Sequence, residues 1–232
     1  MTPRVPGRAQ LWRAPLNLPD ALVTELTEML TAEECASAAA CHGTPQRRRY
    51  IAARAALRAV LAARLGCPPP SVAFTYGRHG KPALVGDTGG RRLDFNLSHS
   101  GELAVIALTD GAAVGVDVEH RQRRVDHARL AARVCSPAER AHYAALPEAQ
   151  RADFFLRLWT RKEAFVKATG EGIWRRLAEL DLAGVEPGAI PAHAPWHLYD
   201  LALEADYVGA LVVAGPLGEI EYRRLDVAAA RG

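Results

Sequence analysis

The chain has 232 residues, of which 49% are hydrophobic and 24% are charged. This length and composition fit one compact globular unit or two small subdomains, and they exclude disordered and collagen-like proteins. The formal net charge of only +3 argues against the strong basic field that most nucleic-acid-binding proteins carry. No apolar run is long enough for a signal peptide or a membrane span, so we expect a cytoplasmic protein with no membrane partner.

The first half of the chain reads as helices followed by strands. Residues 21–40 have helical periodicity, with Thr31 as an N-cap and Glu34 completing a capping box. Residues 47–66 predict a long helix rich in Ala, Leu and Arg that Gly66 ends.

Strand signals follow these helices. A short strand is expected at residues 72–76, followed by the Gly-rich turn GRHGKP. Residues 93–119 predict a strand, a loop that carries Ser98, His99 and Ser100, and a hairpin that turns at Asp110-Gly111.

The second half repeats this order. Helical periodicity resumes at Ala128, restarts at Ser136-Pro137 and returns over residues 152–172. Four strand-like segments then fill the rest of the chain, at residues 180–185, 195–203, 207–216 and 220–227. We therefore predict an α+β protein with two subdomains of similar plan, residues 1–110 and residues 111–232.

The stretch GVDVEH, residues 115–120, places two carboxylates on one face of a predicted strand. Successive side chains of a strand point to opposite faces, so Asp117 and Glu119 share a face, roughly 7 Å apart. A divalent cation bridging them would remove their repulsion. The alternative is a strand end that emerges into solvent, where the arginines among residues 121–124 neutralise it.

A second constellation lies in the predicted helix of residues 152–172. Its aromatic and aliphatic residues form a buried stripe, and Glu163 and Lys167 lie one turn apart at the edge of that stripe beside Trp159. A surface ion pair is the ordinary interpretation of this spacing. The same position also suits a third metal ligand and a phosphate-binding lysine, and oxygen ligands alone indicate Mg²⁺ or Mn²⁺ rather than Zn²⁺.

The order FNLSHSG, GVDVEH and WTRKEAFVK resembles the 4'-phosphopantetheinyl transferases of the larger, surfactin-synthetase-activating type. GRHGKP and CSPAE extend the resemblance to about residues 45–175. It implies two similar α+β halves related by a pseudo-twofold axis, each a small antiparallel sheet packed with helices, with coenzyme A in the cleft between them.

The resemblance also implies an activity. Such an enzyme moves the 4'-phosphopantetheine arm of coenzyme A to a serine of an apo acyl or peptidyl carrier protein of polyketide, nonribosomal-peptide or fatty-acid synthesis. Adenosine 3',5'-bisphosphate is released, and the enzyme generally acts as a monomer. The carrier supplies the nucleophile, so the enzyme needs to position the reactants and stabilise charge.

Site residues follow from the matched motifs. Mg²⁺ is assigned to Asp117, Glu119 and Glu163. Coenzyme A is assigned to Arg54 and His99 at the 3'-phosphate, Lys81 at the adenine, Ser98 and Lys167 at the phosphates, and Lys162 in an assisting role. Catalysis is assigned to Lys167 as a second positive contact and to Glu163 or Glu139 as the base, although Glu139 also fits a capping box with Ser136.

The sequence departs from the family pattern in the helix of residues 47–66, at the end of GVDVEH, and at Cys135, where an aromatic residue is common. Arg47, Arg48 and Arg49 stand where some members have lysines, and His120 replaces a common lysine. The principal alternative to a transferase is a Mg²⁺-dependent phosphohydrolase of nucleotide diphosphates. A binding module without turnover is a second alternative, which the four charged residues Asp117, Glu119, Glu163 and Lys167 disfavour.

Overall fold

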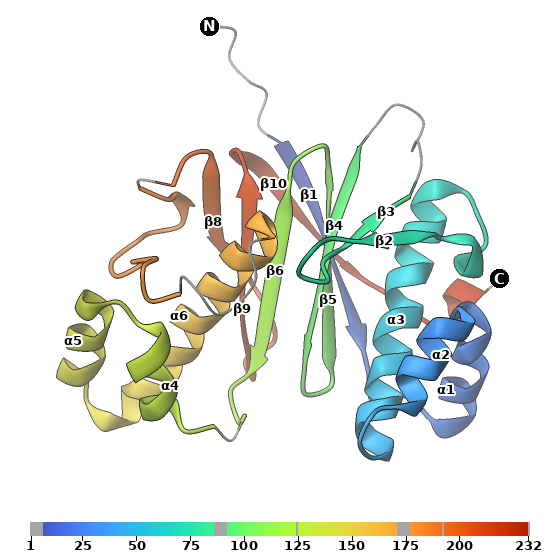
Figure 1. Cartoon of the computed structure of the whole chain (residues 1–232), viewed down its shortest axis with the longest axis horizontal. Coiled ribbons are helices and arrows are strands. Elements are labelled where there is room, and N and C mark those ends of the chain that lie inside the picture. Colours follow the sequence, from blue (N-terminus) through green and yellow to red (C-terminus); the bar gives the residue numbers. More distant parts are fainter. Residues whose placement is uncertain (1–6, 86–91, 124, 171–176, 192, 232) are drawn as a thin grey trace, which may run out of the picture.

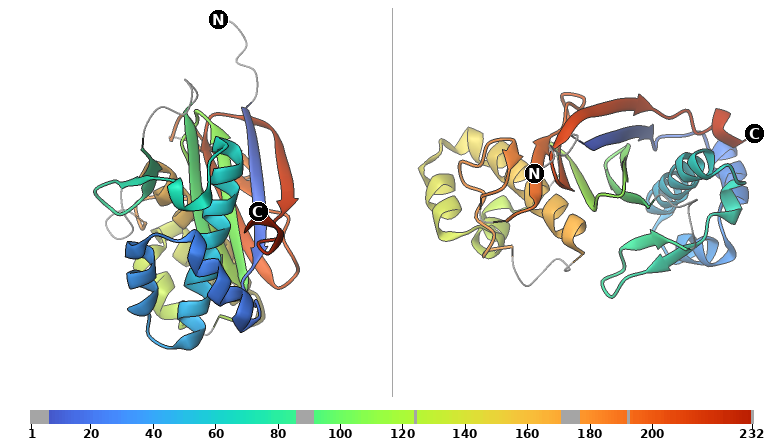
Figure 2. Two further views of the ribbon diagram at one scale, coloured as in Figure 1. Left: turned by 90° about the vertical axis from the view of Figure 1, so that its right-hand side faces the viewer. Right: turned by 90° about the horizontal axis from the view of Figure 1, so that it is seen from above.

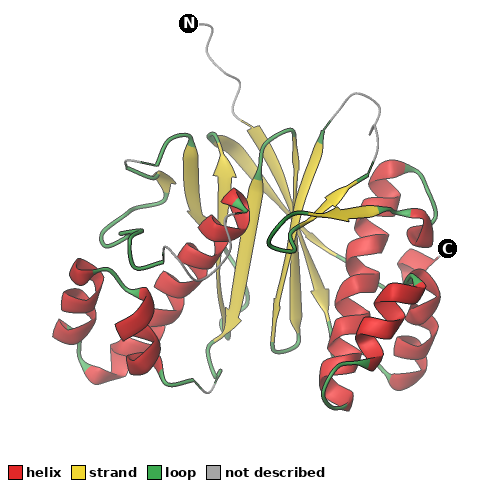
Figure 3. Ribbon diagram, in the orientation of Figure 1, coloured by secondary structure: helices red, strands yellow, loops and turns green. Residues whose placement is uncertain are grey.

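Helices occupy the two ends of the molecule, and two four-stranded sheets lie between them (Figure 1). The structure is a computed structural model that describes residues 7–85, 92–123, 125–170, 177–191 and 193–231. Figure 3 shows the same layers by secondary structure, and Figure 2 shows them from the side and from above. The predicted α+β class is confirmed.

One helical end comes from the first half of the chain. It contains α1 (Asp20–Leu26), α2 (Ala32–Ala39) and α3 (Thr44–Leu65), with a 3-10 turn, η1 (Thr27–Met29), between the first two. The capping box of Thr31 and Glu34 is present at the start of α2, as predicted. Gly66 ends α3 with a positive φ of 67°, a backbone conformation that glycine adopts without steric cost.

The first sheet has the order β10-β1-β5-β4. Its strands are β1 (Gly7–Pro15), β4 (Leu93–Ser100), β5 (Leu103–Asp110) and β10 (Leu217–Arg224). Strand β10 comes from the end of the chain and pairs parallel with β1, whereas the other pairs are antiparallel. The first sheet is therefore mixed, where an antiparallel one was expected.

The second sheet has the order β6-β9-β8-β7. Its strands are β6 (Val114–His120), β7 (Gly188–Ala189), β8 (Trp196–Asp200) and β9 (Tyr207–Ala214). The other helical end covers it with α4 (His127–Val134), α5 (Pro137–Ala145) and α6 (Glu148–Thr169). A small hairpin of β2 (Phe74–Tyr76) and β3 (Pro82–Leu84) follows the 3-10 turn η2 (Pro69–Ser71), and η3 (Ala229–Arg231) follows β10.

The two sheets are joined by a shared apolar cluster. Val114, Val116 and Val118 of β6 pack with residues of β1, β5 and β9 and are at most 1% exposed. This burial confirms that the three valines occupy one face of the strand. Each helical end has its own core besides this one.

Several local predictions were wrong. Asp110-Gly111 is no hairpin turn, because β5 pairs with β4 and β1 whereas β6 pairs with β9 in the other sheet. Ser98, His99 and Ser100 lie in β4 rather than in a loop, and residues 180–185 form no strand. Strand β1 was not predicted, although Ala9 and Leu11 alternate with Gln10 as the residues of a strand do.

Strand β10 also bears on the domain division. It belongs to the second half of the chain but completes the first sheet, so the division at residues 110 and 111 stays a prediction. No helix in the described ranges combines the length and the apolar character needed to cross a membrane.

Candidate active site

Strands β4 and β6 meet through side chains rather than through a backbone ladder. Asn96 Oδ1 accepts a hydrogen bond from Val116 N at 2.9 Å, Ser98 Oγ accepts from Val118 N at 3.3 Å, and Ser100 Oγ accepts from His120 N at 3.1 Å. The three polar residues alternate along β4 and so share a face. They accept hydrogen bonds from backbone N–H groups at the edge of β6 and so hold in place the strand that carries the two carboxylates.

The carboxylates of β6 lie against helix α6. A Cβ atom added to Gly115 would lie 2.1 Å from Ala164 O and 2.3 Å from Ala168 N, so the helix backbone approaches the strand as closely as only glycine permits. Asp117 and Glu119 are 5% and 6% exposed, and Glu163, from α6, is 4% exposed. Two elements distant in sequence thus bring three acidic side chains into one buried region.

Burial and mutual repulsion change the protonation of these groups. Desolvation, followed by the charges of Asp117 and Glu119, raises the pKa of Glu163 to about 7. The pKa of Glu119 is also raised, first by desolvation and then by Asp117, although its bond from Ser100 acts the other way. Like charges held this close together are unfavourable unless a cation joins them.

Two side-chain cations contact the carboxylates. Lys167 Nζ lies 2.6 Å from Asp117 Oδ1 and donates to Ser98 Oγ at 3.1 Å. Arg123 Nη1 pairs with Glu119 Oε1. Ser98 Oγ and Ser100 Oγ complete the set by donating to Asp117 Oδ1 at 2.8 Å and to Glu119 Oε2 at 2.7 Å.

The donor atoms that remain fit a divalent metal ion. Asp117 Oδ2 and Glu163 Oε1 are buried and have no hydrogen-bond partner in the part of the chain that the structure describes. Orphaned carboxylate oxygens are costly in a protein interior and are the ligands that Mg²⁺ prefers. Within the described ranges, no three His, Cys, Asp or Glu side chains already converge as a ligand set. In the structure, Lys167 contacts one oxygen of Asp117, and Arg123 contacts one oxygen of Glu119.

Glu139 and Lys162 form a separate, fully buried ion pair. Lys162 Nζ lies 2.6 Å from Glu139 Oε2, and both side chains are 0% exposed. The other Glu139 oxygen accepts from Leu182 N at 2.8 Å, and Oε2 also accepts from Ser136 N in the predicted capping box. Lys162 further donates to Val134 O and Leu177 O. The pair ties α5, α6 and the segment after α6 together.

Lys81 lies at the border of the two halves. From the β2–β3 turn it donates to Val114 O at 2.9 Å and to Ala168 O at 3.3 Å, and desolvation lowers its pKa. It lines a pocket of about 550 Å³ formed by the β2–β3 hairpin, the start of β4 and the end of α6. The volume lies within the range of about 300–1,000 Å³ usual for small-molecule sites.

Arg54 and His99, both predicted at the 3'-phosphate, have different neighbours in the structure. Arg54 pairs with the buried Glu34 at 2.5 Å and stacks over Phe74. The pKa of His99 is lowered by desolvation and by the positive charges of Lys167 and Arg49. His99 therefore lies near the carboxylate region and near Arg49, whereas Arg54 belongs to an ion-pair cluster with Glu34.

Sequence reasoning missed the role of Asn96, the bonds of Ser100 to β6 and the pairing of Arg49. The pairing of Arg123 with Glu119 was foreseen in the alternative in which arginines of residues 121–124 neutralise the carboxylates. The alternation of Asn96, Ser98 and Ser100 would have indicated a polar strand face had these residues been interpreted as a strand. Arg49 pairs with Glu102 across a sequence separation that no local pattern reveals. Arg124, one of the arginines expected to neutralise the strand end, lies outside the described residues.

Comparisons with known proteins match most of the chain. The model of the 4'-phosphopantetheinyl transferase superfamily matches residues 113–212, and that of the 4'-phosphopantetheinyl transferase N-terminal region matches residues 20–110. The 4'-phosphopantetheinyl transferase HetI of Nostoc sp. is 37% identical over 88% of this chain and 87% of its own length.

Two further relatives agree. A putative 4'-phosphopantetheinyl transferase of Synechocystis sp. is 37% identical over 71% of this chain and 65% of its own. The 4'-phosphopantetheinyl transferase of Bacillus subtilis is 28% identical over 69% of this chain and 71% of its own. The resemblance read from the motifs is confirmed: this chain belongs to the 4'-phosphopantetheinyl transferase family.

Proposed function

We propose that this protein transfers the 4'-phosphopantetheine arm of coenzyme A to a serine of an apo carrier protein in a Mg²⁺-dependent reaction. The observation that carries the proposal is the buried group of Asp117, Glu119 and Glu163, in which two oxygens have no described partner. This group borders a lysine, Lys167, and lies between the two halves of the fold.

The proposed metal ligands are Asp117, Glu119 and Glu163, and Mn²⁺ would suit the same oxygen donors. When bound there, the ion would neutralise charge on the diphosphate of coenzyme A. Lys167 would place a second positive charge on a phosphate, and Ser98, which already contacts both Lys167 and Asp117, would orient them.

For the general base we favour Glu163 over Glu139. The carrier serine must lose its proton while its oxygen bonds to the pantetheine-side phosphorus and the bond to adenosine 3',5'-bisphosphate breaks. Glu163 is the candidate that borders the proposed metal site, and its Oε1 has no hydrogen-bond partner among the described residues. Glu139 is fully buried and hydrogen-bonded at both oxygens. This supports a structural role for Glu139, as a helix cap and as the ion-pair partner of Lys162.

We assign the nucleotide of coenzyme A to the pocket that Lys81 lines. Lys81 and the hairpin would border the adenine, and His99 would face the 3'-phosphate with Arg49. Arg49 is the member of the Arg47–Arg49 group whose charge acts on His99. Arg54, predicted at the same phosphate, is held by Glu34 and would serve by fixing the hairpin through Phe74.

We further propose that the protein works as a cytoplasmic monomer on acyl or peptidyl carrier domains of polyketide or nonribosomal-peptide synthesis. The two halves, residues 1–110 and 111–232, would contribute the nucleotide side and the metal side of the cleft. Sedimentation velocity would test the monomer, because a dimer would have twice the 25.1 kDa mass of one chain.

The activity itself is tested by the intact mass of an apo carrier protein after incubation with the enzyme, coenzyme A and Mg²⁺. The carrier should gain one phosphopantetheine, and Asp117→Ala should abolish the gain, because a metal ligand and the partner of Lys167 are lost. Cleavage of coenzyme A with every tested carrier unmodified would support the phosphohydrolase instead.

A further inference from the structure

The turn after β6 places an arginine on one of the proposed metal ligands. Arg123 N donates to His120 O at 2.9 Å, which folds the chain back toward the strand it has just left. The guanidinium of Arg123 thereby reaches Glu119, four residues earlier, and Nη1 pairs with Oε1. An oxygen that a metal ion would use is therefore already occupied by a side chain of the protein.

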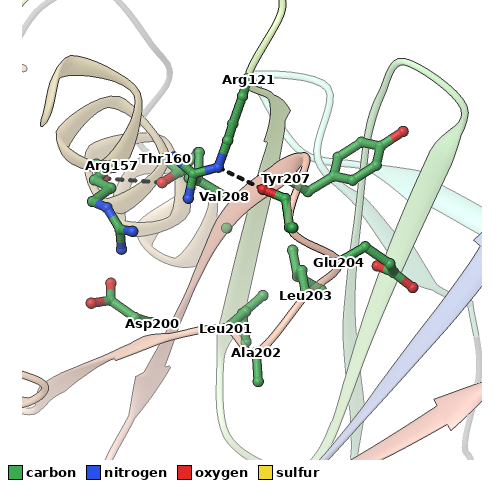
Figure 4. A pocket seen from close by; sticks show the side chains of 12 residues that line it. Arg121, Arg157, Thr160, Asp200, Leu201, Ala202, Leu203, Glu204, Tyr207 and Val208 are labelled. Atoms are coloured by element: carbon green, nitrogen blue, oxygen red, sulfur yellow. Dashed lines mark hydrogen bonds between the residues drawn. The ribbon is translucent and has the colours of Figure 1, made fainter. Parts of the chain in front are cut away.

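The start of this turn is held in place independently of Arg123. Arg121 N donates to Asp206 O at 2.8 Å, and Arg121 Nε donates to Ala205 O at 2.8 Å. Figure 4 shows the Arg121 side chain in a neighbouring pocket that Arg157 and Asp200 also line. Arg121 also pairs with Asp153. Two arginines of one turn thus have different partners.

The two side chains of the Arg123–Glu119 pair differ in exposure and in the number of other contacts that hold them. The side chain of Glu119 is 8% exposed and that of Arg123 is 44% exposed. Glu119 is also held through its other oxygen by Ser100 Oγ at 2.7 Å. A guanidinium this exposed is already largely hydrated, so it loses little when it returns fully to water. Arg123 can therefore leave at little cost, whereas Glu119 stays where it is.

Charge shows why the arginine has to leave. The three carboxylates carry at most three negative charges, and Lys167 and Arg123 supply two positive ones in the structure. A divalent cation adds two more, so a retained guanidinium would repel the ion and would occupy an oxygen that it needs. Lys167 is the less mobile of the two, because its side chain is 25% exposed and contacts both Asp117 and Ser98.

We propose that Arg123 is a displaceable counterion of Glu119: it pairs with Glu119 Oε1 in the metal-free protein and moves into solvent when a divalent cation binds. This inference rests on the metal site of the proposed function. Arg123 then satisfies a buried carboxylate while the site is empty, and it sets the affinity of the site by competing with the cation. It acts through Glu119 and is a positioning residue.

The first test measures Mn²⁺ affinity by the electron paramagnetic resonance signal of free Mn²⁺, with coenzyme A present. Arg123→Gln should lower the Mn²⁺ dissociation constant about three- to tenfold, because a competing charge is removed. Arg123→Lys, which keeps the charge, should stay within about twofold of the wild type. The matched control is Arg121→Gln, which removes the same charge from the same turn without touching Glu119, and it should also change the constant less than about twofold.

The second test observes the exchange directly by nitrogen-15 NMR of arginine side chains. The Nε–Hε resonance of Arg123, identified by its loss in Arg123→Lys, should shift on addition of Mg²⁺ and coenzyme A. The resonance of Arg121, which is bonded to Ala205 O, should not shift comparably. Coenzyme A without Mg²⁺ should leave the Arg123 resonance in place.

The outcomes separate this inference from the proposed function. Equal Mn²⁺ constants for Arg123→Gln and Arg121→Gln, together with an Arg123 resonance that ignores Mg²⁺, would overturn the counterion role and leave the transferase standing. A wild-type protein that takes up no Mn²⁺ even with coenzyme A would overturn the metal site, and the counterion role with it.

Discussion

Burial and neighbouring charge set the state of Glu163, the acidic residue of α6. It is 4% exposed, and its pKa is raised to about 7 by desolvation and by Asp117 and Glu119. Without a metal ion this environment opposes ionisation, and with one it supplies a ligand. An environment that suits a metal-binding carboxylate thus lowers the stability of the metal-free protein when Glu163 is ionised.

The metal-free protein should therefore lose stability as pH rises. The folded state binds the Glu163 proton more tightly than the unfolded state, whose pKa is near 4.5. The resulting stability is fully present below pH 4.5 and is lost as pH rises through about 7. In EDTA at pH 8, Glu163→Gln should be more stable than the wild type by up to roughly 3 kcal/mol.

Urea unfolding at pH 5, 6.5 and 8 in EDTA measures this difference. The gain from Glu163→Gln should be small at pH 5 and largest at pH 8. The exposed Glu33, changed to Gln, provides the control and should show no such trend. If the free energies of unfolding of wild type and Glu163→Gln differed by the same amount at all three pH values, the raised pKa of Glu163 would be contradicted.

The contact between β6 and α6 is the element-scale feature on which the site depends. Strand β6 buries three valines toward the other sheet and turns Gly115, Asp117 and Glu119 toward the helix. Because Gly115 has no side chain, the helix backbone can approach, and the carboxylate of Glu163 comes within the field of the other two. Glycine is thus required here for a close approach, not for a turn.

Gly115→Ala should force α6 away from β6. The added Cβ would meet the backbone atoms Ala164 O and Ala168 N at 2.1 and 2.3 Å, which no side-chain rotation relieves. We expect a loss of stability of about 1–3 kcal/mol or more, together with loss of Mn²⁺ binding in the folded protein. Urea unfolding and Mn²⁺ titration measure the two effects.

Gly77→Ala is the matched control for this substitution. Its added Cβ would lie 3.6 Å from Lys81 O, an ordinary contact, so unfolding should occur at nearly the wild-type urea concentration. Equal stabilities of Gly115→Ala and Gly77→Ala would mean that α6 and β6 can separate freely.

At the scale of the whole molecule, the chain closes on itself through β10. This strand crosses from the second half and pairs with β1 over the length of both strands. Leu225 and Val227, which follow β10, are buried in the helical core of the first half. Strand β10 and the residues that follow it therefore complete the sheet and the core of the first half (Figure 2).

Deletion of residues 217–232 should unfold the first sheet. Strand β1 would lose one of its two neighbours, and the core beneath it would lose Leu225 and Val227. Hydrogen exchange of the β1 amides should become at least about a hundredfold faster, as expected for a loss of about 3 kcal/mol. Deletion of residues 229–232 alone should leave β1 protected. Unchanged β1 exchange in the long deletion would show that the first half holds together without β10.

Sequence patterns predicted what depends on short spacing. The caps at Thr31 and Ser136, the end of α3 at Gly66 and the alternation along β6 are set by neighbours within a few residues, and all are confirmed. Predictions that needed a distant partner did worse. The turn at Asp110-Gly111 suggested a hairpin, but the preferred partner of β6 is β9, almost a hundred residues later.

The sequence by itself determined the residue chemistry: three carboxylates, a lysine one turn from the third, and the motifs that identify the family. Only the tertiary structure decided which of the charged side chains lie together. It placed Glu139 with Lys162 and Arg54 with Glu34, and it brought Arg123 onto Glu119 and Lys167 onto Asp117. Local patterns encode helix and strand periods, whereas ion pairing in a protein interior depends on which elements pack together, and that is settled by burial over the whole chain.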